Sequence, residues 1–234
     1  MPPWSPTEHA ACRLFRDSAI LRLVRRQYST EPAEPGEFTR RFDRFYSRFA
    51  VVYDSFVKAG PFWKRWLAQA LPHIRGRRDL EVSCGTGYLL TQYAGRVQAS
   101  AVDLNGKMVE VTNENLSKAK LTADVRQADV EALPYPDESF DTVLNTMSFS
   151  GYPNGRAALA EMIRVLEPGG RLVLIDVGYP DDENKLGTLL TELWRRSGDL
   201  IRDMDALFRE AGLDYWREPI GGSGSIQLYV ATKP

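Results

Sequence analysis

Two glycines in the segment Glu81-Val-Ser-Cys-Gly-Thr-Gly87 could bring the backbone close to a ligand. The segment follows a short apolar run, typical of a buried strand, and precedes a predicted helix over residues 87–95. Because Gly85 and Gly87 lack side chains, they allow a tight turn where a nucleotide-like ligand can approach the backbone. The third glycine of a dinucleotide fingerprint is replaced by Leu90, which argues against NAD(P) without excluding it. A purely structural turn is the alternative.

A carboxylate follows the turn at about the spacing of 20 residues that ribose recognition requires. Asp103 ends the apolar run 98–103, and a carboxylate at the end of a second strand can accept hydrogen bonds from both ribose hydroxyls. The alternative is a helix cap, because Asn105 and Gly106 follow with turn and cap chemistry. Asp129 ends the next predicted strand and adds a further carboxylate.

These residues need a parallel sheet to bring them together, and the sequence predicts one. From residue 79 onward apolar strands alternate with amphipathic helices, which is typical of a parallel sheet with helices on both faces. The strands are predicted over 79–82, 98–103, 124–129, 140–146 and 171–177, and the helices over 87–95, 106–119, 155–166, 185–196 and 203–211. Two final strands, 212–222 and 225–234, flank a glycine-rich turn and predict an antiparallel hairpin. We therefore predict an α/β, Rossmann-like fold with a seven-stranded, mostly parallel sheet.

The part of the chain before this sheet is expected to form two further units. Residues 10–28 predict a basic helix, and the proline-rich segment 31–37 predicts a linker, so residues 1–36 should stand apart from the domain at 37–234. Aromatic residues at helical spacing predict an N-terminal helical cap over 37–75, with a helix beginning at Pro61.

Charge is distributed unevenly along the chain. Residues 10–78 hold 15 lysines and arginines against 6 acidic residues, whereas residues 79–234 hold 15 against 24. The basic part could bind phosphorylated substrates, anionic lipid headgroups or nucleic acid, or it could be a solvated helix face.

Composition disfavours several other chemistries. The chain has two cysteines and two histidines, which are too few and too scattered for a disulfide framework or a zinc site, so no metal is expected. No apolar run approaches the roughly 18 to 20 residues of a membrane span. The first residues also lack a charged segment followed by an apolar one, so we expect a cytoplasmic protein.

Four ordered blocks resemble the class I S-adenosylmethionine (SAM)-dependent methyltransferases, of the type that includes the ubiquinone/menaquinone biosynthesis C-methyltransferases (methyltransferase type 11). The blocks are LEVSCGTG, VDLNGKM, QADVEALPYPDESFDTV and EMIRVLEPGGRLVLID, and they span most of residues 79–177. YDSFVKAGPFWKRWL upstream and GSIQLYVATKP downstream extend the resemblance. The resemblance implies SAM as the cofactor and transfer of its methyl group to an acceptor by in-line displacement. An NAD(P)-dependent oxidoreductase and a non-catalytic SAM-binding protein are the alternatives.

The resemblance also assigns residues to each part of the cofactor. It places the methionine part against Glu81, Ser83, Cys84, Gly85, Thr86 and Gly87. It places Asn145 below that part and Tyr53 over the cofactor. It places Asp103 at the ribose, and Leu104, Met108, Asp129 and Val130 around the adenine. Ser83 departs from the family pattern, in which a glycine is usual, so its side chain should narrow the pocket or add a hydroxyl bond.

The acceptor is less well defined. Because the sulfonium of SAM is already a good leaving group, the protein mainly has to align the acceptor and exclude water. A phenol or ring carbon would need a base, for which Tyr46, Tyr53, Tyr179 and Asp176 are the candidates. The segment 145–148 lacks the Asn/Asp-Pro-Pro-Tyr/Phe loop of enzymes that methylate amino groups of nucleic acid, so nucleic acid is disfavoured. We expect a small-molecule or lipid-like acceptor (an amine, a quinol or phenol, or a phospholipid headgroup), with peripheral membrane contact through residues 10–28.

Overall fold

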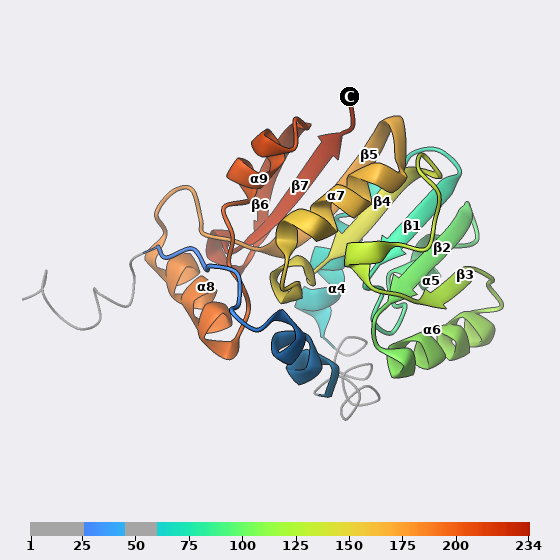
Figure 1. Cartoon of the computed structure of the whole chain (residues 1–234), viewed down its shortest axis with the longest axis horizontal. Helices are drawn as coiled ribbons and strands as arrows, with labels where there is room; N and C mark the ends of the chain where they lie inside the picture. Colours follow the sequence, from blue (N-terminus) through green and yellow to red (C-terminus); the bar gives the residue numbers. More distant parts are fainter. Residues whose placement is uncertain (1–25, 45–59) are drawn as a thin grey trace, which may run out of the picture.

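A seven-stranded sheet lies between two layers of helices in the computed structural model, which describes residues 26–44 and 60–234 (Figure 1). The strand order is β3-β2-β1-β4-β5-β7-β6; β7 pairs antiparallel with both neighbours, and the other pairs are parallel. The predicted Rossmann-like fold with a C-terminal antiparallel hairpin is therefore confirmed. The strands are β1 Arg78–Val82, β2 Gln98–Asp103, β3 Asp124–Gln127, β4 Phe140–Thr146, β5 Leu166–Val177, β6 Asp214–Gly221 and β7 Ile226–Thr232.

The helices begin at side chains that satisfy their first backbone N–H groups. Asn105, Asn154, Asn184 and Asp203 each accept such a hydrogen bond and cap α6, α7, α8 and α9, respectively. Their bounds agree closely with the predicted ones. From residue 60 onward, the α-helices are α4 Pro61–Ala68, α5 Leu90–Tyr93, α6 Gly106–Ala119, α7 Gly155–Val165, α8 Lys185–Ser197 and α9 Met204–Glu210.

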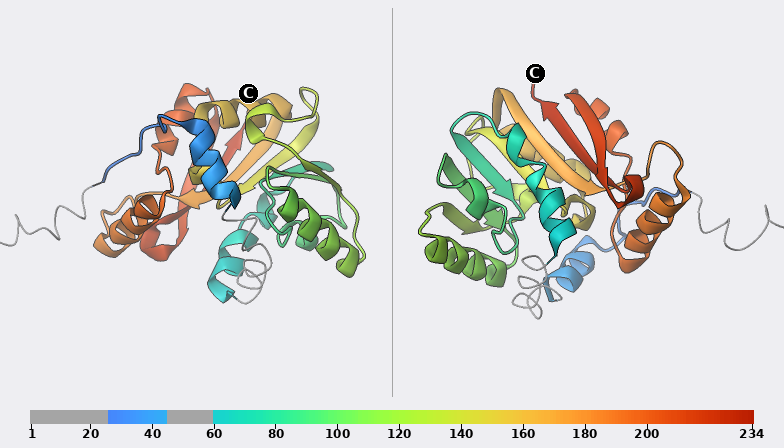
Figure 2. Two further views of the ribbon diagram at one scale, coloured as in Figure 1. Left: turned by 60° about the horizontal axis from the view of Figure 1, so that its bottom comes forward. Right: turned by 180° about the vertical axis from the view of Figure 1, so that it is seen from behind.

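The core forms two layers because successive strand residues point to opposite faces of the sheet. Leu172 and Leu174 of β5 pack with Met162 of α7 and Phe208 of α9 on one face. Val173 and Ile175 belong to the cluster on the other face, and the residues of α4, α5 and α6 in that cluster include Leu67, Leu90 and Leu116. Figure 1 shows α7 and α9 in front of the sheet, and the rear view in Figure 2 shows α4 in front of the opposite face.

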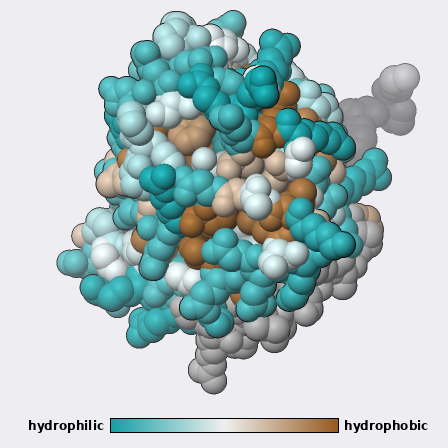
Figure 3. Space-filling view, turned by 90° about the vertical axis from the view of Figure 1, so that its right-hand side faces the viewer, coloured by the Kyte–Doolittle hydropathy of each residue, from teal (hydrophilic) through white to brown (hydrophobic). Residues whose placement is uncertain are grey.

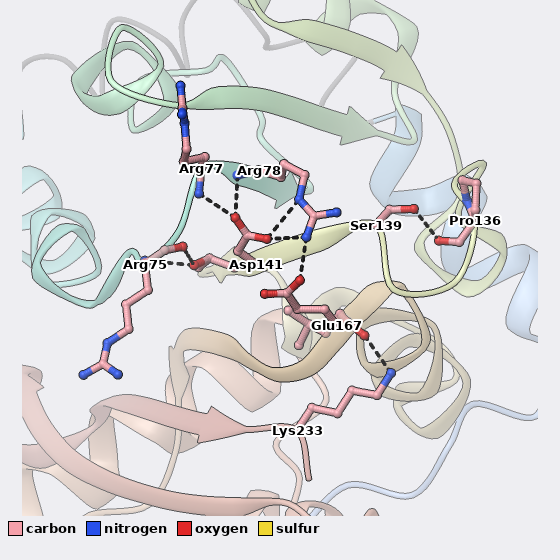
Figure 4. A network of polar contacts seen from close by, with 10 residues as sticks. Arg75, Arg77, Arg78, Pro136, Ser139, Asp141, Glu167 and Lys233 are labelled. Carbon is pink, nitrogen blue, oxygen red and sulfur yellow. Dashed lines mark hydrogen bonds and ion pairs between the residues drawn. The ribbon is translucent and has the colours of Figure 1, made fainter.

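The amino ends of β1 and β4 are tied together by Asp141 (Figure 4). Its carboxylate accepts hydrogen bonds from the backbone N–H of Arg78 and from the Arg78 side chain Nε, both at 3.0 Å. Burial alone would raise the pKa of Asp141, but the hydrogen bonds from Arg77 and Arg78 outweigh it and lower the pKa. Because β1 and β4 are neighbours that lie at the switch point of the sheet, this network fixes the two strands whose other ends carry the site.

The β3 edge of the sheet is covered by polar side chains. Arg126 pairs with Asp124 at 2.6 Å on this short strand, and charged residues on an edge oppose pairing with another chain. Figure 3 views this end of the molecule and shows a largely hydrophilic surface with apolar residues gathered between the polar ones.

Three predicted segments differ from the structure. The helix predicted over 87–95 is confined to α5, because the turn with its left-handed glycine at Gly87 continues as far as Leu89. Residues 35–44 form a helix that begins inside the predicted linker at Pro35, a residue suited to the first helical position. Of the basic helix predicted over 10–28, only residues 26–28 are described, and they are not helical.

Candidate functional site

A cavity of about 370 Å³ opens at the carboxyl ends of β1, β2 and β4. This is the side of an open parallel sheet on which ligands bind, at the point where the connections diverge. The helix at residues 35–44 and the helix α4 contribute its other walls, through Phe42 and Trp63 among others. Ten of the predicted cofactor residues line it, namely Glu81, Ser83, Cys84, Gly85, Thr86, Asp103, Leu104, Met108, Asp129 and Val130.

The two glycines of the turn after β1 have different surroundings. Both have left-handed backbone conformations, with φ of 57° at Gly85 and 69° at Gly87. A Cβ at Gly85 would meet nothing within 4 Å, whereas one at Gly87 would lie 2.7 Å from Cγ2 of Thr112 in α6. Gly85 therefore leaves its backbone open toward the cavity, and Gly87, which is absent from the cavity wall, allows the turn to pack on α6.

Asp103 joins the turn after β1 to the end of β2. Its Oδ2 accepts the backbone N–H of Gly85 at 2.8 Å, and its Oδ1 accepts that of Asn105 at 2.9 Å. Burial raises the pKa of Asp103 to about 6, although these hydrogen bonds act in the opposite direction. Asn105 caps α6, so Asp103 is not the helix cap, and Asp103 lines the cavity.

Glu81 places a second buried carboxyl group in the cavity wall. It accepts a hydrogen bond from the Tyr93 hydroxyl at 3.1 Å, and burial raises its pKa to about 8. A cation bound next to Glu81 would favour the ionised form and lower this pKa again. The methionine part of SAM, with its ammonium and sulfonium groups, fits such a wall.

The wall formed by the loops after β2 and β3 suits an adenine ring. Leu104 is 38% exposed although it is apolar, and it lines the cavity together with the buried Met108. Asp129 accepts the backbone N–H of Glu131 at 2.9 Å and also lines the cavity, beside Val130. Apolar side chains beside a carboxylate can enclose a flat ring and accept hydrogen bonds from its amino group.

Tyr152 is a lining residue that the sequence did not reveal. Its hydroxyl lies 2.7 Å from the Ser83 hydroxyl and 2.6 Å from Nδ2 of Asn145. Asn145 is fully buried behind this contact and does not line the cavity, so its predicted place below the methionine part is not a direct wall position. Ser83 has a left-handed backbone with φ of 54°, which explains why a glycine suits that position. In the sequence, Tyr152 could have been found only as a tyrosine in the loop after the fourth predicted strand.

A further carboxyl group in the cavity wall is that of Asp199, which follows α8. Its Oδ1 accepts a hydrogen bond from the Ser150 hydroxyl at 3.0 Å, and Ser150 also contacts Oδ1 of Asp176 at 3.0 Å. Asp176, a predicted base, is buried behind the wall at the end of β5. Asp199 therefore holds the wall position that the sequence had suggested for Asp176.

The helix at residues 35–44 covers the cavity and contacts its floor. The side chain of Asn105 donates to Oδ1 of Asp43 at 2.7 Å. Pro35, Gly36, Thr39, Phe42 and Asp43 all line the cavity, so this helix forms part of its wall.

Of the tyrosines predicted as bases, Tyr179 is the one that the structure describes. Tyr46 and Tyr53 lie outside the described residues. Tyr179 lines a separate pocket of about 160 Å³, where its hydroxyl hydrogen-bonds to Glu192 and to the backbone oxygen of Gln27. The reason is that the chain turns away toward α8 after β5 ends at Val177.

Within 26–44 and 60–234, no group of histidine, cysteine, aspartate and glutamate side chains is placed to hold a metal ion. In the same part of the chain, no helix is both long and apolar enough to span a membrane.

Comparison with known sequences identifies the domain. Residues 80–174 match the family described as "Methyltransferase domain". The ubiquinone/menaquinone biosynthesis C-methyltransferase UbiE of Shewanella pealeana is 33% identical over 127 residues, covering 52% of this chain and 51% of that protein. The phosphatidylethanolamine N-methyltransferase of Cereibacter sphaeroides is 35% identical over 135 residues, covering 57% of this chain and 66% of that protein. The chain thus spans about half the length of UbiE and somewhat more of the second relative.

Comparison with solved structures supports the fold. The [4+2]-cyclase SpnF superposes with a TM-score of 0.71 at 18% identity, covering 88% of this chain and 99% of that one. The N-methyltransferase NodS of Bradyrhizobium japonicum WM9, solved with S-adenosyl-L-homocysteine, gives 0.62 at 16% identity, covering 76% and 90%. At such low identity these neighbours establish the architecture alone. The sequence matches confirm the predicted SAM-dependent methyltransferase domain.

Proposed function

Residues 80–174 form a methyltransferase domain, and from this premise we propose that the chain transfers the methyl group of SAM to a small-molecule or lipid-like acceptor. The acceptor is an amine, a quinol or phenol, or a phospholipid headgroup. The observation that carries the proposal is the hydrogen bond between Gly85 and Asp103 at the cavity, because it sets an open backbone turn beside a carboxylate at the end of β2, where a ribose would be held.

The residues around the cavity would hold the cofactor in an extended arrangement. Glu81 and the turn at 83–87 would bind the methionine part, Asp103 the ribose, and Leu104 and Asp129 the adenine. When bound, SAM supplies a methyl group on a positively charged sulfur that leaves readily. The protein's own contribution is to align the acceptor and to exclude water, which the helix at 35–44 supports by covering the cavity.

A lipid-like acceptor has support of its own. One relative is named as a phosphatidylethanolamine N-methyltransferase, and the segment at residues 10–28 is basic. We propose that this segment contacts an anionic membrane surface from the cytoplasm. In flotation with vesicles of phosphatidylglycerol and phosphatidylcholine, the full chain should float and the variant Arg22→Glu/Arg25→Glu should stay behind. Equal flotation of both proteins argues against membrane contact through this segment.

Calorimetry separates the methyltransferase from the oxidoreductase alternative. The full chain should bind SAM and S-adenosylhomocysteine and should not bind NAD⁺ or NADP⁺. Binding of a nicotinamide dinucleotide without binding of SAM rejects the proposal. A non-catalytic SAM-binding protein is recognised by SAM binding without formation of S-adenosylhomocysteine across a panel of amines, quinols, phenols and phospholipids.

A further inference from the structure

The charged side chains in the described wall of the cavity are all acidic. The wall includes the carboxyl groups of Asp43, Glu81, Asp103, Asp129, Glu131 and Asp199, and among the described lining residues there is no lysine, arginine or histidine. A partly enclosed site whose charged groups are all acidic favours cations over anions. The wall therefore suits a cationic methyl donor and also an acceptor that is or becomes positively charged.

Most of these carboxyl groups lie on the cofactor side. Glu81 is on β1, Asp103 ends β2, and Asp129 follows β3, while Asp43 is bonded to Asn105 at the start of α6. Asp199 reaches the cavity from the other direction, through the segment after α8, and its partner Asp176 lies on β5. Since the strand order is β3-β2-β1-β4-β5, Asp199 is linked through Ser150 to the β5 side of the sheet, whereas the predicted ribose and adenine residues follow β2 and β3.

Asp199 is held so that it can take up a proton. Its Oδ1 faces the Ser150 hydroxyl at 3.0 Å, and its Oδ2 faces the Ser197 hydroxyl at 3.1 Å. The Ser150 hydroxyl has a single hydrogen and contacts Asp176 as well, so it can donate to only one of the two carboxylates at a time. The second contact becomes a hydrogen bond when that carboxyl group is protonated and donates to Ser150.

We propose that Asp199 binds the methyl acceptor, that the acceptor is an amine, and that Asp199 receives its proton. The inference rests on the proposed methyltransferase function and adds the acceptor class to it. The amine nitrogen gives its lone pair to the methyl carbon, the carbon–sulfur bond breaks, and its electron pair stays on sulfur. A proton on the nitrogen passes to the Asp199 carboxylate, and no oxidant or reductant is needed.

The electrostatics favour an amine over an oxygen acceptor. As the methyl group moves, positive charge shifts from sulfur to the acceptor nitrogen, and a fixed carboxylate beside it stabilises that charge. A phenolate would instead enter a wall of like charge. Burial raises the pKa of Asp199, although the hydrogen bonds from Ser150 and Ser197 and the charge of Arg41 act against this, so the carboxylate is a better proton acceptor than a solvent-exposed aspartate.

A binding experiment tests Asp199 without knowledge of the natural acceptor. Sinefungin resembles SAM but carries an amine in place of the methyl sulfonium, so its ammonium group points toward the acceptor side. Calorimetry on the full chain should show that sinefungin binds about 10-fold more tightly than S-adenosylhomocysteine, and that Asp199→Asn removes this preference. The matched control Asp129→Asn, on the adenine side, should weaken both ligands alike.

The outcomes distinguish the two levels of the proposal. If the full chain binds neither ligand, the proposed function fails. If both ligands bind and Asp199→Asn leaves the sinefungin preference unchanged, the role of Asp199 is rejected. If thermal denaturation shows that the Asp199→Asn variant is not folded, Asp199→Ser is used in its place.

Turnover tests the acceptor class. The amines tested are ethanolamine, N-methylethanolamine, benzylamine and phosphatidylethanolamine vesicles, and the oxygen acceptors are catechol and a hydroquinone. S-adenosylhomocysteine should form with at least one of the amines and with neither oxygen acceptor. Asp199→Asn should then lower kcat about 100-fold, with the affinity for SAM changed by less than about 3-fold. Turnover with the oxygen acceptors alone, or SAM binding without turnover on any amine, overturns the inference.

Discussion

The hydroxyl of Tyr152 lies 2.7 Å from the hydroxyl of Ser83, and this contact joins the loop after β4 to the turn after β1. Ser83 has φ of 54°, a left-handed conformation that costs a residue with a side chain roughly 1 to 2 kcal/mol. The hydrogen bond to Tyr152 offsets about 1 kcal/mol of this strain. The loop that carries the glycine turn is thus held by a side-chain contact at a position where a glycine would relieve the strain.

A double-mutant cycle measures this contact. Ser83→Gly should leave the free energy of unfolding within about 1 kcal/mol of the natural chain, because it removes strain and a hydrogen bond together. Tyr152→Phe should cost about 1 to 2 kcal/mol in the natural chain and about 1 kcal/mol less in the Ser83→Gly background. Urea unfolding gives all four values. An equal cost of Tyr152→Phe in both backgrounds means that the Ser83 contact contributes nothing.

Substitution by alanine should mainly weaken SAM binding at Gly85 and mainly lower stability at Gly87. Gly85→Ala should lower stability by only about 1 kcal/mol, since its Cβ meets nothing within 4 Å, but should weaken SAM binding because that space is cavity. Gly87→Ala should lower stability by about 2 to 4 kcal/mol, since its Cβ would lie 2.7 Å from Cγ2 of Thr112.

A second substitution controls for the Gly87 result. Thr112→Ser removes Cγ2 and keeps the hydroxyl that donates to the Gly85 carbonyl at 2.8 Å. Thermal denaturation should therefore show that Gly87→Ala costs less in the Thr112→Ser background. The same cost in both backgrounds would show that left-handed strain alone accounts for the loss.

Asp103→Asn should weaken SAM binding by about 10- to 100-fold, because charge-assisted hydrogen bonds to the ribose are lost. The ionised carboxylate is the form that accepts them, and the pKa of Asp103 is about 6. Affinity of the natural chain should therefore fall as the pH drops through about 6, while that of the asparagine variant changes less across the same range. Calorimetry between about pH 5 and pH 8 measures both. Parallel pH profiles would assign the dependence to another group.

Glu81→Gln should stabilise the fold at alkaline pH. Burial raises the pKa of Glu81 from its usual value near 4.5 to about 8. As the pH rises between these two values, ionisation of Glu81 therefore opposes folding increasingly. The free energy of unfolding of the glutamine variant, relative to that of the natural chain, should rise by on the order of 2 kcal/mol between about pH 5 and pH 9. A glutamine oxygen can still accept the Tyr93 hydrogen bond. The variant should also bind SAM less tightly, since it lacks a carboxylate for the cation. A stability difference that is flat with pH would contradict the role of burial.

The sequence by itself determined the alternation of strands and helices, because apolar periodicity and helix caps are local signals. The helix over 106–119 was predicted at its observed bounds, and Asn105 at its start supplies the cap. The order of glycine turn, Asp103 and Asp129 likewise placed three strand ends at one edge, since parallel strands end on the same side of a sheet.

Only the tertiary structure decided which of these residues line the cavity. Gly87 packs on Thr112, and Asn145 lies behind Tyr152, although both belong to the motifs. Asp199 reaches the cavity from beyond α8, far along the chain from the glycine turn, while Tyr179 turns to a separate pocket. The physical reason is that a cavity wall is set by contacts between elements distant in sequence, and local periodicity carries no information about those contacts.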